Sequence, residues 1–244
     1  MTAMLEVDGL TKVFGGLRAV DDCSFDVAEN SVTALIGPNG SGKTTLFNMI
    51  TGYLRPDAGQ VRFRGRDVTG LDSGRLYRAG LSRTFQQARV FPQLTVVENL
   101  VAAGGHNWRQ LLTTARVART DRERADRLLD EFRLEPVADL AAAELSYGQR
   151  KLLEFAAVLM SDPALVLLDE PTAGVNPVMI ETMERHIRER HAAGTTFLVV
   201  EHDMPFVMRL CDPVIVLDQG HRLVTGSPAE VQAHPDVLDA YLGS

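Results

Sequence analysis

A glycine-rich stretch, Gly37-Pro38-Asn39-Gly40-Ser41-Gly42-Lys43-Thr44, constrains this chain more than any other part of its sequence. It follows Val32–Ile36, a continuous apolar run of the kind that forms a strand buried on both faces of a sheet. It precedes Thr45–Thr51, which has the pattern of a helix. A strand, a tight loop and a helix in succession are a building unit of α/β proteins, so the stretch predicts an α/β fold.

The stretch matches the pattern G-x-x-x-x-G-K-[ST] in full, and phosphate binding explains the residue types. Glycines let backbone N–H groups turn inward around phosphate oxygens, and the helix N-terminus adds positive potential. Lys43 is expected to reach the β- and γ-phosphates, and the Thr44 hydroxyl to hold Mg²⁺. The residues predicted to contact a nucleoside triphosphate here are Gly37, Asn39, Gly40, Ser41, Gly42, Lys43, Thr44 and Thr45. A glycine-rich turn without a ligand is the alternative, which the flanking segments disfavour.

A second apolar run, Leu165–Leu168, ends in two adjacent acids, Asp169 and Glu170. Adjacent carboxylates are costly in a core, so they are expected at the carboxyl edge of the sheet. Asp169 would hold the Mg²⁺ shell, and Glu170 would polarise the attacking water as a general base. His202 follows another buried run, Phe197–Val200, and is placed to contact the γ-phosphate. The alternatives are a loop that is acidic by chance and an ordinary loop histidine.

Composition limits the partners of this chain. Its 244 residues carry a formal net charge of −7, which argues against non-specific binding to nucleic acid. No apolar run approaches the roughly 18 residues of a membrane span, and no signal peptide is visible, so any membrane role is expected to come through a partner. Cys23 and Cys211 are expected to be two buried thiols. The remaining histidines show no metal-ligand spacing and are assigned no chemistry: His106, His186, His191, His221 and His234.

The stretch from about 88 to 160 differs from the rest because it lacks β-type runs and is rich in Ala, Leu and Arg. Ala125, Leu128, Leu129 and Phe132 recur at the spacing of one amphipathic helix face. We interpret this stretch as a helical subdomain inserted into an α/β core formed by about 1–87 and 161–244. In the core, short runs predict further strands at Leu5–Val7, Ser24–Val27, Val61–Phe63, Thr196–Val200 and Val214–Leu217, and a helix at Val178–Arg190. The alternation of strands and helices predicts a mostly parallel sheet.

Leu145-Ser146-Tyr147-Gly148-Gln149 resembles the signature motif of ABC ATPases and lies, as that motif does, upstream of the paired acids. Ser146 would provide a helix N-cap and Gly148 an open backbone, so the motif forms a second anion site within one chain. One nucleotide does not need two such sites. Two chains facing head-to-tail do, because each then closes the site of the other. The resemblance therefore implies that Ser146, Gly148 and Gln149 contact a nucleotide bound to a second ATPase subunit, identical or related.

Other motifs of the ABC family follow in the same order along the whole chain. Gln86 matches the glutamine that contacts Mg²⁺ and the water and senses the membrane partner, and His202 matches the switch histidine. Ala173–Pro177 matches the D-loop, and Phe14 matches the aromatic that stacks on adenine. Three residues depart from the usual pattern, Tyr147, Asn176 and Phe14, and none of them removes a group that does chemistry. The resemblance implies a P-loop NTPase fold: a RecA-like core with an N-terminal antiparallel β edge and the inserted helical subdomain.

Within this family the chain resembles the ATPase subunits of branched-chain amino acid importers, the Liv-type group. The stretches that carry the likeness are Phe14–Val20, Arg83–Gln86, Leu94–Leu100, Leu145–Gln149 and the tail His234–Gly243. The likeness implies ATP hydrolysis that powers uptake of branched-chain amino acids or a related small solute. It further implies a cytoplasmic location at the inner face of the membrane, on two transmembrane permeases, with an extracytoplasmic solute-binding protein choosing the solute.

Three other functions would use part of the same sequence. A lipid-export ABC motor would carry the same catalytic residues, and only its partner would differ. An ABC regulator without a permease usually has tandem ATPase domains or long arms, whereas this sequence shows one ATPase domain and no basic extension. A P-loop kinase would need a site for the phosphate acceptor and would have no signature motif, so Ser146–Gln149 argues against it.

The permease is expected to dock at the seam between the core and the helical subdomain. This segment begins with Gln86, Val90, Phe91, Leu94 and Val96, and its apolar side chains would be exposed in a lone chain. A groove that receives a short helix from the partner would use them, and packing within the subdomain is the alternative.

Overall fold

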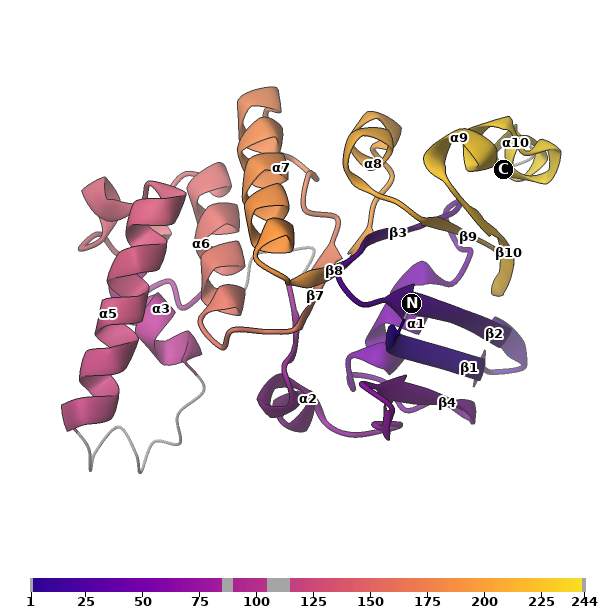
Figure 1. Ribbon diagram of the computed structural model, residues 1–244, viewed down its shortest axis with the longest axis horizontal. Helices are drawn as coiled ribbons and strands as arrows, with labels where there is room; N and C mark the ends of the chain where they lie inside the picture. The colour runs from indigo at the N-terminus through magenta and orange to yellow at the C-terminus, as the bar shows by residue number, and fades with distance from the viewer. Residues whose placement is uncertain (1, 85–89, 105–114, 243–244) are drawn as a thin grey trace.

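Strands and helices alternate along the chain, and the computed structural model describes residues 2–84, 90–104 and 115–242. The strands are β1 (Ala3–Phe14), β2 (Leu17–Ala28), β3 (Val32–Ile36), β4 (Ala58–Phe63), β5 (Arg66–Asp67), β6 (Leu81–Arg83), β7 (Leu165–Asp169), β8 (Thr196–Val200), β9 (Val214–Asp218) and β10 (His221–Gly226). The helices are α1 (Lys43–Ile50), α2 (Ser73–Ala79), α3 (Val96–Ala103), α5 (Ala115–Phe132), α6 (Tyr147–Leu159), α7 (Pro177–Ala192), α8 (Met204–Leu210), α9 (Pro228–Ala233) and α10 (Pro235–Leu242). Figure 1 shows the antiparallel strands β1, β2 and β4 at one end of the molecule and α3, α5 and α6 at the other.

A six-stranded sheet with the order β10-β9-β3-β8-β7-β6 forms the centre of the fold, and its neighbours are parallel except for the β10–β9 pair. The side chains of its inner strands point alternately into two hydrophobic cores. On β3, for example, Ala34 and Ile36 face one core while Leu35 faces the other. Burial on both faces is the reason that these strands are continuous apolar runs in the sequence. The predicted mostly parallel sheet is therefore confirmed, and β3 and β8 have the predicted bounds.

A four-stranded antiparallel sheet with the order β2-β1-β4-β5 lies against one face of the central sheet, with α1 sharing the core between them. The Asp21 N–H donates to the Gly220 carbonyl at 3.0 Å and so joins β2 to the β9–β10 turn. The predicted N-terminal antiparallel edge is confirmed. Strands β1 and β2 have 12 residues each. The predicted runs, Leu5–Val7 and Ser24–Val27, are shorter because polar residues alternate with buried ones in the rest of each strand.

The helical part of the chain packs on the other face of the central sheet. The predicted face of α5 is buried, since Ala125, Leu128, Leu129 and Phe132 are all at most 3% exposed. Phe132 meets Phe155 of α6 edge-on, with 5.5 Å between ring centroids, and Phe155 in turn lies 6.4 Å from Phe197 of β8. The helices inserted between β6 and β7 thus share one continuous hydrophobic core with the sheet.

Candidate functional site

The loop between β3 and α1 surrounds a cavity of about 200 Å³, whose lining residues are Ala19, Asn39, Gly40, Gly42, Lys43, Thr44, Thr45 and Glu170. Gly42 is the N-cap of α1 and has φ +99°, and a Cβ at that position would collide with the Ala19 carbonyl oxygen of β2. A side chain there would therefore be strained both by its backbone conformation and by its neighbour. The fold brings six of the predicted phosphate-contacting residues to one cavity together with the predicted general base.

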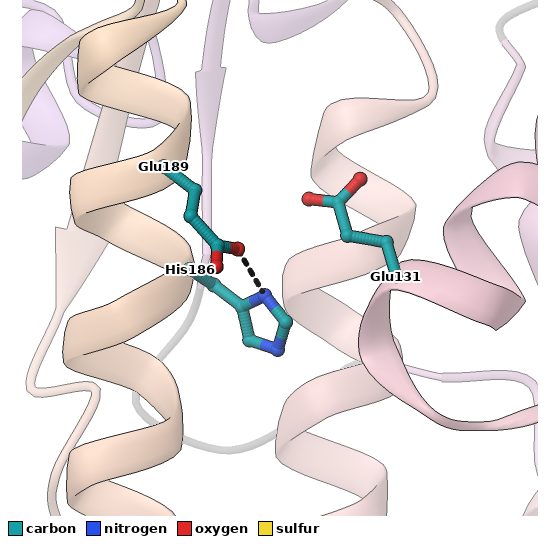
Figure 2. Close-up of side chains that lie close together, drawn as sticks. All are labelled: Glu131, His186 and Glu189. Atoms are coloured by element: carbon teal, nitrogen blue, oxygen red, sulfur yellow. Dashed lines mark ion pairs between the residues drawn. The ribbon is translucent and has the colours of Figure 1, made fainter.

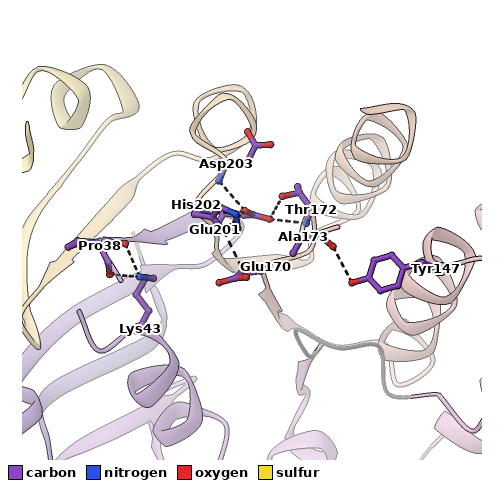
Figure 3. Close-up of polar contacts among 10 residues, drawn as sticks. Pro38, Lys43, Tyr147, Glu170, Thr172, Ala173, Glu201, His202 and Asp203 are labelled. Carbon is purple, nitrogen blue, oxygen red and sulfur yellow. Dashed lines mark hydrogen bonds and ion pairs between the residues drawn. The ribbon is translucent and has the colours of Figure 1, made fainter. Parts of the chain in front are cut away.

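The Lys43 ammonium lies inside the loop. Its Nζ donates to the carbonyls of Gly37 at 2.7 Å and Pro38 at 2.8 Å, and lies 3.4 Å from the Ser41 hydroxyl (Figure 3). Burial lowers the pKa of Lys43, because the charged form loses solvation, and the nearby charge of Glu170 acts in the opposite direction. The other two predicted residues of the loop do not line the cavity: Ser41 is buried, and Gly37 packs against Leu217 of β9.

Asp169 ends β7 and is held by an arginine that the sequence argument did not single out. The Arg83 Nη2 donates to Asp169 Oδ2 at 2.8 Å, and both side chains are buried. The same guanidinium donates to Asn48 Oδ1 at 2.7 Å and Thr51 Oγ1 at 2.8 Å, so it fixes α1 relative to β7. Burial raises the pKa of Asp169, which outweighs the opposing effect of Arg83.

Glu170 and His202 follow the neighbouring parallel strands β7 and β8 and face each other. The His202 Nδ1 lies 3.9 Å from Glu170 Oε2, and the imidazole is largely exposed. The Glu170 N–H donates to the Val200 carbonyl at 2.9 Å, which extends the pairing of the two strands by one residue. Adjacent strand ends therefore place Glu170 in the cavity lining and His202 next to Glu170, at the carboxyl edge of the sheet.

The predicted signature segment begins α6 on another part of the surface. Ser146 is the N-cap, with its hydroxyl accepting from the Gln149 N–H at 3.3 Å, and Gln149 Oε1 accepts from the Ser146 N–H at 2.9 Å. This reciprocal pair is a capping box, so the expected N-cap is confirmed. Figure 3 shows Lys43 and Tyr147 on opposite sides of Glu170 and His202. None of Ser146–Gln149 lines the cavity at the glycine-rich loop.

Two other predicted site residues lie apart from this cavity. Phe14 is at the end of β1, where it pairs with Leu17 across the hairpin turn and is exposed, with Lys12 Nζ 5.7 Å from its ring centroid. It does not line the cavity, although Ala19 on the following strand does. Gln86 lies outside the described residues.

The segment predicted to contact a permease is only partly exposed. Phe91 has 60% of its surface exposed, and Asn99 fixes its backbone by accepting from the Phe91 N–H at 2.7 Å and donating to the Phe91 carbonyl at 3.1 Å. Leu94 is half-buried. The expectation that Val96 would be exposed is wrong. Val96 is the first residue of α3, and its side chain is fully buried in the core that α3 shares with α5 and α6.

One histidine that was assigned no chemistry lies among acids contributed by two helices. His186 and Glu189 of α7 and Glu131 of α5 have ligand-type atoms within 4.8 Å of one another (Figure 2). Two observations explain the group without a metal. The Arg190 guanidinium engages both Glu131 carboxylate oxygens, and the buried His186 ring stacks on Phe132 with 4.0 Å between centroids. Burial lowers the pKa of His186 to about 4, so the imidazole is neutral at pH 7, and the group serves to join α5 to α7.

Comparison with known proteins agrees with this geometry. A model of the ABC transporter family matches residues 20–173, and a model of the branched-chain amino acid ATP-binding cassette transporter matches residues 222–244. The high-affinity branched-chain amino acid transport ATP-binding proteins BraF of Pseudomonas aeruginosa and LivG of Salmonella typhimurium are each 40% identical to the chain, with 98% of both sequences covered. A nucleotide-free crystal structure of an ATP-binding cassette from an ABC transporter, and the ADP conformation of such a cassette, each have a TM-score of 0.88 at 35% identity and cover 100% of both chains. The chain therefore belongs to the ABC transporter family, as one of its ATP-binding ATPases.

Proposed function

We propose that the chain is the ATP-hydrolysing subunit of an importer that takes up branched-chain amino acids or a related small solute. The cavity that joins Lys43 and Thr44 to Glu170 carries the proposal for hydrolysis, because phosphate-binding groups and a candidate base line the same space. The likeness to BraF and LivG over nearly the whole chain, together with the matching tail at 222–244, supports the solute class.

In this proposal the loop residues Gly37–Thr45 hold the triphosphate, and Phe14 stacks on the adenine. Lys43 contacts the β- and γ-phosphates. Glu170 accepts a proton from the water that attacks the γ-phosphorus, and His202 donates a hydrogen bond to the γ-phosphate; the products are ADP and phosphate. Gln86 is assigned to the same water from the family motif.

Thr44, Asp169 and Gln86 are the residues proposed to hold Mg²⁺. The oxygen donors suit this ion: the Thr44 side chain is exposed at the cavity, and Asp169 is fixed by Arg83 through Oδ2 at 2.8 Å, which leaves Oδ1 for the ion or its water shell. When bound, Mg²⁺ would neutralise charge on the phosphate oxygens.

We further propose that a complete site needs two chains. Ser146, Gly148 and Gln149 begin α6 away from the cavity, and Figure 3 shows Lys43 and Tyr147 separated by the Glu170–His202 loops. A second ATPase subunit, identical or related, would bring its own signature segment to the γ-phosphate. ATP would then bind the closed dimer more tightly than the open one, and hydrolysis would remove this preference.

The proposed complex places the two ATPase chains on two transmembrane permeases at the cytoplasmic face of the membrane, with an extracytoplasmic solute-binding protein acting from the other side. No helix among the described residues is long and apolar enough to span a bilayer. The division into a core at about 1–87 and 161–244 and a helical subdomain at about 88–160 fits this arrangement. In this division, the exposed Phe91 lies near the start of the helical subdomain in the sequence.

Uptake of labelled amino acid tests the proposal. A strain that lacks the chain should lose high-affinity uptake of leucine, isoleucine and valine. The wild-type gene should restore uptake, while Lys43→Ala should not, because the substitution removes the cation that lies in the phosphate loop. Full uptake in the strain that lacks the chain would contradict the solute class, whereas ATP hydrolysis by the Lys43→Ala protein at the wild-type rate would contradict the nucleotide site.

A further inference from the structure

Glu201, which lies between β8 and His202, is a buried carboxylate surrounded by four hydrogen-bond donors. Its Oε1 accepts from the Thr172 N–H at 2.8 Å and the Thr172 hydroxyl at 2.7 Å. Its Oε2 accepts from the N–H groups of His202 at 2.9 Å and Asp203 at 3.2 Å. The residue is 1% exposed, and a buried carboxylate is tolerated only when its oxygens are satisfied in this way. Each oxygen therefore holds a different loop.

The two loops that Glu201 joins carry the groups proposed to act on the water and the γ-phosphate. Glu170 is two residues before Thr172, and His202 follows Glu201 directly. The His202 Nδ1 lies 3.9 Å from Glu170 Oε2 and also 3.9 Å from Glu201 Oε2. Glu170 has φ +47°, an uncommon conformation for a residue with a side chain, which the surrounding bonds must maintain. Figure 3 shows that Glu201 stands between the loop of Glu170 and Thr172 and the loop of His202 and Asp203.

The same turn is also connected to the signature segment. The Tyr147 hydroxyl donates to the Ala173 carbonyl at 3.2 Å, one residue beyond Thr172. Its ring lies over Gly174, where a Cβ would be 3.2 Å from Tyr147 Cε1. Tyr147 is 40% exposed, so this contact, rather than burial in a core, fixes the ring. Because Tyr147 follows the N-cap Ser146, a continuous series of contacts runs from the signature segment to Glu201.

We propose that Glu201 is a positioning residue for ATP hydrolysis and that the Tyr147 hydroxyl connects it to the signature segment. Glu201 sets the separation of Glu170 and His202 by holding their loops together. Tyr147 transmits the position of α6, which in the dimer follows the nucleotide of the other chain, to the turn at Thr172 and Ala173. The inference rests on the two-chain site proposed above. A glycine at 147 would lack the hydroxyl and could not make this connection.

Glu201→Gln tests the positioning role with little change of shape. The amide offers one accepting oxygen and one donating nitrogen, so the N–H groups of one loop would face another N–H. We expect kcat to fall about 10- to 100-fold while KM for ATP stays within about threefold. In the chain without nucleotide, hydrogen exchange should accelerate at the amides of Thr172, His202 and Asp203. Glu135→Gln, at an exposed glutamate, makes the same charge change and should alter neither reading. Wild-type kcat or unchanged exchange in Glu201→Gln would overturn the assignment.

Tyr147→Phe tests the connection. It also serves if Glu201→Gln fails to fold, because it removes one hydroxyl from an exposed residue and keeps the ring. We expect kcat to fall about 3- to 10-fold with unchanged nucleotide affinity of a single chain. The double variant should lie within about twofold of Glu201→Gln alone, since contacts in one network are not additive. Losses that multiply, or a Tyr147→Phe protein with wild-type kcat, would overturn the connection. The proposed function fails separately, if the wild type does not hydrolyse ATP or Glu170→Gln turns over fully.

Discussion

At the scale of single residues, Glu170 has the surroundings that a general base needs. It lines the cavity with Lys43 and Thr44, and its carboxylate is partly exposed, so a water can reach it. Glu170→Gln should keep ATP binding and lower turnover by about 10²- to 10⁴-fold, because the amide preserves the shape but cannot accept a proton. The variant should accumulate as an ATP-bound dimer in size-exclusion chromatography, measured on the chain and on the full complex. A monomer at saturating ATP, under conditions in which the wild type assembles, would contradict this.

Candidate site residues can be predicted from the sequence where their signal is local. Lys43, Thr44 and Asp169 each stand at the end of an apolar run or inside a short pattern, so their neighbours in the sequence reveal them. The roles of Arg83 and Glu201 were not predicted, although Glu201 directly follows the apolar run of β8, because their partners are distant: Arg83 donates to Asp169, 86 residues away, and Glu201 accepts from Thr172, 29 residues away. Only the pairing of β6, β7 and β8 brings these groups together.

At the scale of elements, the turn before α3 presents an apolar side chain on a rigid backbone. Asn99 donates to the carbonyls of Leu94 and Thr95 as well as Phe91, and Thr95 caps α3. Phe91→Asp should therefore leave the fold and the basal ATPase activity of the isolated chain unchanged, while abolishing copurification with the permeases. Leu238→Asp, at an exposed apolar residue of α10, is the matched control and should assemble normally. Intact assembly of Phe91→Asp, or a chain that unfolds, would count against docking at this turn.

The elements whose bounds the sequence predicted most closely are those with an uninterrupted buried pattern. Strands β3, β7, β8 and β9 have both faces in a core, and the α5 stripe is fully buried. The edge strand β10 was missed because its residues are exposed or half-buried and mostly polar, and β6 was missed because it has only 3 residues. Val96 was misjudged for a related reason: an apolar residue beside a loop looks exposed until the helices that cover it are placed.

At the scale of the whole molecule, the fold separates the glycine-rich loop from the signature segment, the two elements that the proposed two-chain site brings to one nucleotide. The loop before α1 lies beside the carboxyl edge of the central sheet, and α6 belongs to the inserted helices (Figure 1). The hydrophobic core is continuous from Phe132 of α5 through Phe155 of α6 to Phe197 of β8, whereas the described residues of α5 and α6 do not line the cavity. In the proposed head-to-tail dimer, the symmetry of the pair would bring the loop of one chain to α6 of the other without bending either chain.

Substitution of Ser146 separates a two-chain site from a self-contained one. Ser146→Arg should leave nucleotide binding by a single chain nearly intact and block hydrolysis, because the arginine would occupy the place of the partner's γ-phosphate. Ser227→Arg is the matched control: Ser227 also caps a helix through a capping box, so this variant loses a cap worth about 1 kcal/mol without touching the site.

When Ser146→Arg and Lys43→Ala chains, each inactive alone, are mixed in equal amounts, half of the dimers should have one interface with both substitutions and one with neither. If one working site suffices, the mixture should recover about a quarter of the wild-type rate. If Ser146→Arg alone hydrolyses ATP at the wild-type rate, each chain completes its own site and the head-to-tail dimer is wrong.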